Sequence, residues 1–270
     1  MSALAVLWFF LIFVLIAGYF VLDGFDLGIG VLYRALAKTE GERALVRRSI
    51  GPVWDGNEVW LLTAGGALFA AFPAAYATTF SGFYLAVMLV LFGLIVRAVS
   101  LEFRAHDKQW GRVWDACFTV GSFLPALLLG VALGNVIAGI PMAENGDYAG
   151  VPLLGLLSPF TLVTGLLGLA MCLSAGAAWA ALKTQHESAV HARAEKLRAP
   201  LQIAALVHRW WPAARAPTYP RSSCSRRRPC AWWDFPRFRC SPTWWLPRPA
   251  AWAQPSRWQV QPRPTRRWPG

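Results

Sequence analysis

Long apolar stretches, separated by short polar segments, make up most of the first 207 residues of the chain. A helix that crosses a lipid bilayer needs roughly 20 mainly apolar residues. Five segments meet this requirement, at about residues 4–22, 59–76, 80–99, 116–140 and 153–182. This pattern predicts an all-α integral membrane protein with five transmembrane helices. The first segment has neither the basic start nor the small-residue cleavage site of a signal peptide, so we expect it to be retained.

The charges in the connections alternate along the chain. Lysines and arginines follow the first, third and fifth segments, whereas the second connection is uncharged and the fourth carries only Glu144 and Asp147 as charged residues. Basic connections remain on the cytoplasmic side of a membrane. The sequence therefore predicts that the N-terminus lies outside and that the chain returns to the cytoplasm after the fifth segment.

The net charge of +12 comes entirely from the last part of the chain. Before Arg209 there are 13 Lys and Arg and 13 Asp and Glu, whereas the rest has 13 Arg and one acid, Asp234. The same part holds 9 of the 15 Trp and 12 of the 19 Pro, and no segment of it is apolar enough to span a membrane. We therefore divide the chain into a transmembrane bundle, residues 1–207, and a basic tail, residues 208–270, which we expect to be disordered.

Three interpretations of this tail compete. Arg-, Pro- and Trp-rich sequence without lysine is what a GC-rich gene gives when it is translated out of frame, so a frameshift is the preferred one. A basic aromatic segment that binds nucleic acid or anionic lipid is the second, because arginine and tryptophan suit both. A Pro-rich interaction segment is the third.

Acidic residues at membrane depth are the main candidates for function, because charges inside a bilayer are costly and tend to be buried and functional. Asp23 and Asp26 lie three apart and so share one helical face. Asp55 and Glu58 have the same spacing at the cytoplasmic mouth of the second segment. Neighbouring carboxylates repel each other unless one of them holds a proton. A pair of acids at the mouth of a membrane helix is therefore the arrangement expected of a proton entry path. The structural alternative is that acids near a helix start favour its dipole.

The apolar segments lack the usual ligands of a haem. None of the five contains histidine, and their Met and Cys residues are isolated. Haem is usually held by His, Met or Cys. The sequence also has no phosphate-binding Gly loop, no nucleophile elbow and no zinc constellation. We therefore expect no metal site and no catalytic residue on this chain alone.

Four longer phrases resemble subunit II of cytochrome bd-type quinol oxidases, and the resemblance extends over about residues 1–205. They are VLDGFDLGIG (21–30), PVWDGNEVWLLTAGGALFAAFPAAYA (52–77), FSGFYLAVMLVLFGLIVRAVSLEFR (80–104) and GSFLPALLLGVALGN (121–135). Members of this family continue with about three further membrane helices. Residues 201–207 look like the start of the first of these, so we expect this chain to be truncated.

The resemblance implies a function in a bacterial inner membrane. Such oxidases take electrons from a membrane quinol and reduce dioxygen to water with protons drawn from the cytoplasm. Subunit I ligates haem b and haem d and carries the quinol site, whereas subunit II stabilises the complex and contributes to a proton path. The expected partners are therefore subunit I, membrane lipid, quinol and small accessory subunits, but no nucleic acid.

The resemblance also assigns roles to individual residues. It implies a proton path through Asp55, Glu58, Trp60 and Glu102. It places Asp23 and Asp26 in buried positions near the interface with subunit I. Other residues around these acids are Trp54, Asn57 and Arg97. Two alternatives remain open, namely a stand-alone transporter with Asp55 and Glu58 as its ion site, and a purely structural membrane scaffold.

Overall fold

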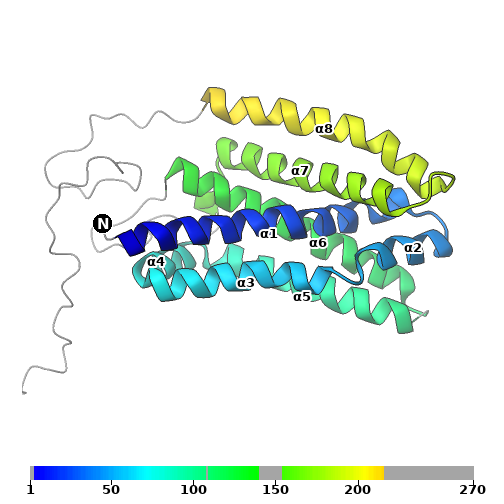
Figure 1. Cartoon of the computed structure of the whole chain (residues 1–270), viewed down its shortest axis with the longest axis horizontal. Coiled ribbons are helices and arrows are strands. Elements are labelled where there is room, and N and C mark those ends of the chain that lie inside the picture. Colours follow the sequence, from blue (N-terminus) through cyan, green and yellow to red (C-terminus); the bar gives the residue numbers. More distant parts are fainter. Residues whose placement is uncertain (1–2, 108, 140–153, 216–270) are drawn as a thin grey trace, which may run out of the picture. The chain divides into compact units, whose positions relative to one another are not determined.

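The computed structural model describes residues 3–107, 109–139 and 154–215, with the side chains of the last helix described as far as Leu206. These residues form helices joined by short connections, and there is no strand among them. Figure 1 shows their arrangement. The helices are α1 (Ala3–Leu36), α2 (Glu40–Ile50), α3 (Trp54–Ala71), α4 (Pro73–Gly82), α5 (Tyr84–His106), α6 (Gly111–Ala138), α7 (Pro159–Lys183) and α8 (Ala189–Arg215), with a 3-10 turn at Leu154–Leu156.

Four of these helices, α1, α5, α6 and α7, are long and apolar enough to cross a membrane. The all-helical membrane class predicted from the sequence is confirmed, but the second expected span, residues 59–76, is not continuous. Residues 59–76 are divided between α3 and α4 at Phe72, whose backbone (φ −136°, ψ 65°) is not helical. The cause is Pro73, because a proline disfavours the helical conformation of the residue before it and suits the first turn of a new helix.

Three helices are longer than the apolar pattern predicts. Helix α1 continues past residue 22 and carries both Asp23 and Asp26. Helix α5 runs to His106, so Arg97, which the pattern places at a helix end, lies well inside a helix. Helix α8 begins at Ala189, before the expected start at residue 201. In α1 and α5, charged residues that are buried between helices interrupt the apolar pattern and therefore look like segment ends in the sequence.

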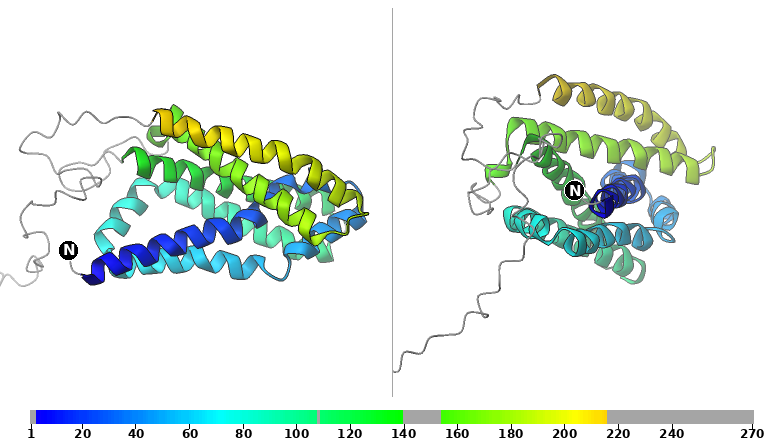
Figure 2. Two further views of the ribbon diagram at one scale, coloured as in Figure 1. Left: turned by 45° about the horizontal axis from the view of Figure 1, so that its top comes forward. Right: turned by 60° about the vertical axis from the view of Figure 1, so that its left-hand side comes forward.

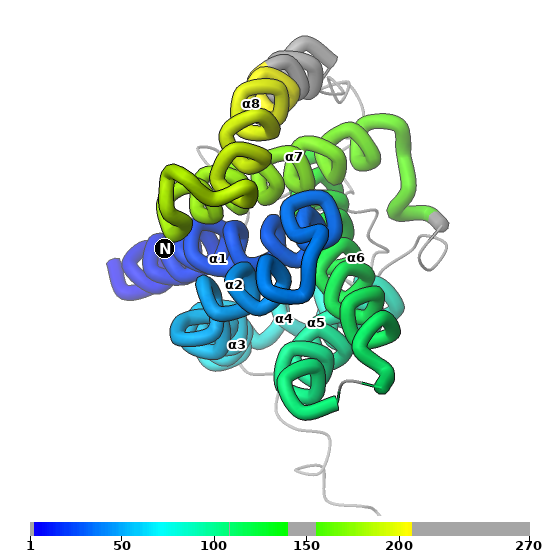
Figure 3. The backbone as a smooth tube through the Cα atoms, turned by 90° about the vertical axis from the view of Figure 1, so that its right-hand side faces the viewer, coloured from blue at the N-terminus to red at the C-terminus, as the bar shows by residue number. Residues whose placement is uncertain are grey.

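Helix α1 lies in the middle of the bundle and packs against α3, α6 and α7, as the two further views show (Figure 2). The pairs α5–α6, α6–α7 and α7–α8 pack as neighbours in sequence. Helix α2 and the α5–α6 and α7–α8 connections gather at one end of the bundle, called the α2 end below (Figures 1 and 3). These are the basic connections, so the arrangement agrees with the predicted topology; the outside location of the N-terminus remains a prediction.

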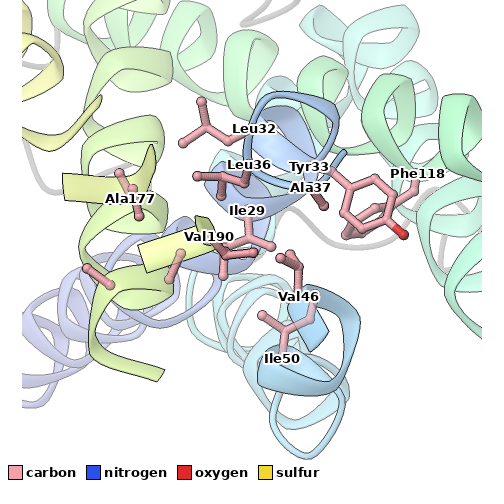
Figure 4. Close-up of a cluster of buried hydrophobic side chains, with 13 residues drawn as sticks. Ile29, Leu32, Tyr33, Leu36, Ala37, Val46, Ile50, Phe118, Ala177 and Val190 are labelled. Atoms are coloured by element: carbon pink, nitrogen blue, oxygen red, sulfur yellow. The ribbon is translucent and has the colours of Figure 1, made fainter. Parts of the chain in front are cut away.

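An apolar core joins α1, α2, α7 and α8 near the α2 end (Figure 4). Its fully buried members include Ile29, Leu36, Ile50, Ala177 and Ala194. Backbones approach closely where glycines face a neighbour, as is common between membrane helices.

Residues 216–270 lie outside the described part of the chain, and so do the predictions of a frameshift and of disorder for them. The backbone of α8 is helical through Arg215 and thus crosses the predicted boundary at residue 208.

Candidate functional site

The centre of the candidate site is a buried ion pair between α1 and α5. Arg97 donates two hydrogen bonds to Asp23, of 2.8 and 3.1 Å, and both side chains have an exposed fraction of 0%. Two parallel charge-assisted bonds of this kind are strong and fix the geometry of both groups. Helix α6 covers the pair at Gly121, where a Cβ would lie only 2.8 Å from the backbone nitrogen of Arg97.

Glu58 brings α3 to the same arginine. Its Oε1 lies 3.3 Å from Arg97 Nη1, without the alignment of a hydrogen bond, and its side chain is 22% exposed. One guanidinium therefore faces two carboxylates. Glu58 is the member that connects the buried pair with the surface of the bundle.

Asp26 is bound separately, one helical turn further along α1. Asn57 Nδ2 donates to Asp26 Oδ2 at 2.7 Å and to the carbonyl oxygen of Leu22 at 3.2 Å. Asp26 is fully buried, and its second oxygen has no hydrogen-bond partner. Asn57 thus fastens α3 to α1 through the acid.

Unsatisfied polar atoms concentrate in this cluster. Among the described residues, buried side-chain atoms without a hydrogen bond are found on Tyr19, Asp26, Glu58 and Arg97, and otherwise only on Arg43. Buried polar atoms normally have a partner, often an ordered water. The cluster contains three carboxylates and one arginine, so it carries surplus negative charge unless it binds protons. The arrangement can therefore exchange protons.

Asp55 and the two tryptophans lie nearer the surface of the bundle. Asp55 is exposed, and its carboxylate accepts a hydrogen bond from the backbone of Gly56 at 2.8 Å. Trp60 packs against α1 at Gly18, where a Cβ would lie 2.6 Å from the indole ring. Trp60 therefore positions α3 against α1, whereas Trp54 is half-buried at the first residue of α3.

Glu102 is not brought into the cluster by any contact of the described residues. Its side chain is exposed and makes no ion pair with another described residue, and its backbone carbonyl lies 3.1 Å from His106 Nδ1. Five residues along a helix correspond to about 140° around its axis, so Glu102 and Arg97 face different sides of α5. Its place in a proton path remains a prediction.

The three histidines whose side chains are described lie at or near helix ends, outside the carboxylate cluster. His106 is the last residue of α5 and is exposed. His186 and His191 lie around the α7–α8 connection, 3.2 Å from each other, and His191 Nδ1 is 2.9 Å from the carbonyl oxygen of Ala181. No group of three potential metal ligands is found within the described ranges.

A second polar cluster, at the α2 end, is not predicted by the sequence analysis. Asp115, which is buried, lies 2.9 Å from Arg104 Nε, 3.0 Å from Arg43 and 3.8 Å from Arg47. Arg104 also binds both oxygens of Glu40 at 2.7 Å. The predicted fourth segment begins at residue 116, so Asp115 falls in a loop by the apolar pattern, and nothing in the spacing joins it to α2.

Comparison with known proteins identifies the family. Residues 4–224 match the family model of the cytochrome bd terminal oxidase subunit II. The chain belongs to this family. The resemblance seen in the sequence is thereby confirmed, and so is the assignment to multi-pass proteins of the bacterial inner membrane.

Curated relatives in this family are close in sequence but longer. The chain is 43% identical over 212 residues to the cytochrome bd-I ubiquinol oxidase subunit 2 of Escherichia coli (strain K12), covering 76% of this chain and 54% of that protein. It is 40% identical over 187 residues to the cytochrome bd ubiquinol oxidase subunit 2 of Bacillus subtilis, covering 68% and 55%. The chain therefore spans about half the length of the curated relatives it matches.

A solved bd oxidase shares the fold of this subunit II chain. The bd oxidase structure from Geobacillus thermodenitrificans superimposes with a TM-score of 0.63 at 16% identity, covering 80% of this chain and 67% of that one. The relatives named above are subunits of ubiquinol oxidases, which are oxidoreductases. The cluster of Asp23, Asp26, Glu58 and Arg97 therefore lies in a member of the cytochrome bd terminal oxidase subunit II family.

Proposed function

We propose that the chain acts as subunit II of a cytochrome bd-type terminal quinol oxidase. The complex oxidises a membrane quinol and reduces dioxygen to water. Subunit I holds haem b, haem d and the quinol site, and this chain stabilises subunit I. Family membership supports this proposal.

The chain also contributes to the supply of protons from the cytoplasm. Asp55 receives a proton at the exposed start of α3, and Glu58 passes it inward. The observation that carries this role is the position of Glu58, which is partly exposed and yet lies 3.3 Å from the fully buried Arg97. The surplus of carboxylates and the unsatisfied atoms around Arg97 give the proton and its water a place inside the bundle.

The test compares Asp55→Asn and Glu58→Gln in the assembled oxidase. Both changes keep the shape of the side chain and remove its ability to exchange a proton. We expect quinol-dependent oxygen consumption to fall at least tenfold, because a lost proton-transfer group typically costs about 10²–10⁴-fold. The haem content of the purified complex, read from its absorption spectrum, reports on assembly and should remain unchanged.

Glu187→Gln is the matched control, because Glu187 is an exposed acid in the α7–α8 connection. Glu102→Gln separates the family-based path from the one that the contacts support, and we expect it to reduce turnover less than Glu58→Gln. Normal turnover of both the Asp55 and Glu58 variants, with normal haem content, would favour the structural scaffold. Failure of the chain to co-purify with a haem-bearing subunit would favour the stand-alone transporter.

A further inference from the structure

An open pocket lies at the α2 end, away from the carboxylate cluster. Its volume is about 570 Å³, and it is formed by the start of α2, the end of α5 and the start of α6. The side chains that characterise it are Glu40, Arg43, Arg104, Trp110 and Arg112. The α5–α6 connection is one of the basic connections predicted to be cytoplasmic.

The pocket carries surplus positive charge. The four arginines in and under it are Arg43, Arg47, Arg104 and Arg112, and the carboxylates among them are Glu40 and Asp115, which leaves two positive charges. Asp107, beside the pocket, uses its oxygens to accept hydrogen bonds from the backbones of Gln109 and Trp110 and from the Trp114 indole. With the charge of Asp107 included, the surplus in and beside the pocket is one positive charge.

The arginines of the pocket wall are held in place. Arg104 is fixed by Asp115 and by Glu40, and its guanidinium lies against Gly111, where a Cβ would be 2.9 Å from the guanidinium carbon. Arg43 is tied to Asp115 at 3.0 Å, and its Nε is buried without a partner. The wall is therefore a preorganised set of donors, which is what recognition of an oxyanion requires.

Arg112 differs from these residues because it is exposed and free of ion pairs within the described part of the chain. Beside it, Trp110 and Val113 expose 58% and 46% of their surface. Tryptophan favours the level of the lipid headgroups. Basic pockets between membrane helices on the cytoplasmic side suit acidic headgroups, with the apolar neighbours left for the acyl chains.

We propose that this pocket binds the phosphate group of an anionic phospholipid. Arg112 closes onto the phosphate from the open side, and Arg43 and Arg104 form the wall behind it. Free inorganic phosphate offers the same oxygens without acyl chains, whereas a zwitterionic lipid offers the phosphate with a compensating cation. The site uses none of the residues of the proton path, so it stands independently of the proposed oxidase role.

The experiment uses the full chain, purified in a neutral detergent and titrated with phosphatidylglycerol while bound lipid is counted by native mass spectrometry. Arg112→Gln is the test variant. Arg48→Gln is the matched control, because Arg48 is an exposed arginine of α2 that does not line the pocket. We expect about fivefold weaker phosphatidylglycerol binding for Arg112→Gln, since an arginine near an anionic surface contributes roughly 1 kcal/mol. Arg48→Gln should bind as the unchanged chain does.

Two further titrations identify the source of the phosphate. Phosphatidylcholine should bind more weakly than phosphatidylglycerol and be insensitive to Arg112→Gln, and inorganic phosphate should not displace the lipid at equal concentration. Circular dichroism confirms that the variants are folded. The proposal is overturned if phosphatidylglycerol binds Arg112→Gln and the unchanged chain equally, if both lipids bind alike, or if inorganic phosphate binds as tightly as the lipid.

Discussion

Replacing Arg97 by methionine tests whether the ion pair with Asp23 holds α5 to α1. Both side chains are fully buried and joined by two hydrogen bonds. Glu58 Oε1 also lies 3.3 Å from Arg97 Nη1. Methionine fills much of the volume but leaves two carboxylates without their cation. Removing one partner of a buried ion pair costs about 3–5 kcal/mol. We expect the free energy of unfolding to fall by this amount.

A double-mutant cycle separates the pair from the packing around it. Asp23→Leu alone should also be strongly destabilising, because it leaves the buried arginine without its two hydrogen bonds and with only Glu58, at 3.3 Å, as a counter-charge. The double variant Asp23→Leu/Arg97→Met removes both charges, and apolar replacements of a whole buried pair are often close to neutral. We therefore expect the double variant to be more stable than either single variant, which requires a coupling energy of at least about 3 kcal/mol.

Unfolding is measured in mixed micelles by titration with sodium dodecyl sulfate, followed by far-ultraviolet circular dichroism. Arg48→Met serves as the control, because an exposed arginine should change stability by no more than about 0.5 kcal/mol. A loss below about 1 kcal/mol for Arg97→Met would refute the reasoning, since it falls outside the range for a broken buried pair. Additive single variants would show that the two residues do not act as a unit.

Further predictions concern the pH dependence of stability and the packing of glycines. Arg193 lowers the pKa of Glu42 to about 2 from its ordinary value of 4.5. Because this pKa is lower in the folded chain, the contribution of Glu42 is complete above about pH 4.5 and is lost as the pH falls toward 2; melting temperatures across that range should drop less for Glu42→Gln. A Cβ on Gly28 would lie 1.8 Å from the Cys172 carbonyl oxygen, whereas Gly66 has open space. Gly28→Ala should therefore cost about 1–3 kcal/mol of unfolding free energy and Gly66→Ala none, in the same titration.

The class of the fold and most of its long helices follow from the sequence, because an apolar stretch of about twenty residues is the length that a bilayer-spanning helix requires. The apolar pattern mispredicts helix ends where charged residues lie inside a helix. It places Asp23 and Arg97 near segment ends because they are charged, yet both lie inside helices and satisfy each other. Their separation of 74 residues leaves no trace in local spacing. Pro73 does mark a helix start, but the apolar pattern runs through it.

The candidate site was partly predictable for the same reason. Asp26 and Glu58 stand out as acids at membrane depth, and both belong to the cluster around Arg97. The role of Asn57 as the link between α3 and Asp26 depends on the crossing of two helices, which local spacing does not encode. Glu102 comes from the family resemblance alone, and the face of α5 on which it lies separates it from the cluster.

The phrase from residue 21 to residue 30 explains why α1 occupies the centre of the bundle. Its acids and its glycines fix different neighbours. Asp23 and Asp26 hold α5 and α3 through Arg97 and Asn57, while Gly28 allows the backbone of α7 to approach. An acid without its partner would be expensive at this depth, and a larger residue in place of the glycine would push α7 away. These ten residues thus constrain the contacts of α1 with three other helices. Few substitutions within them would leave the bundle intact, and the same ten residues are among those that carry the resemblance to the family.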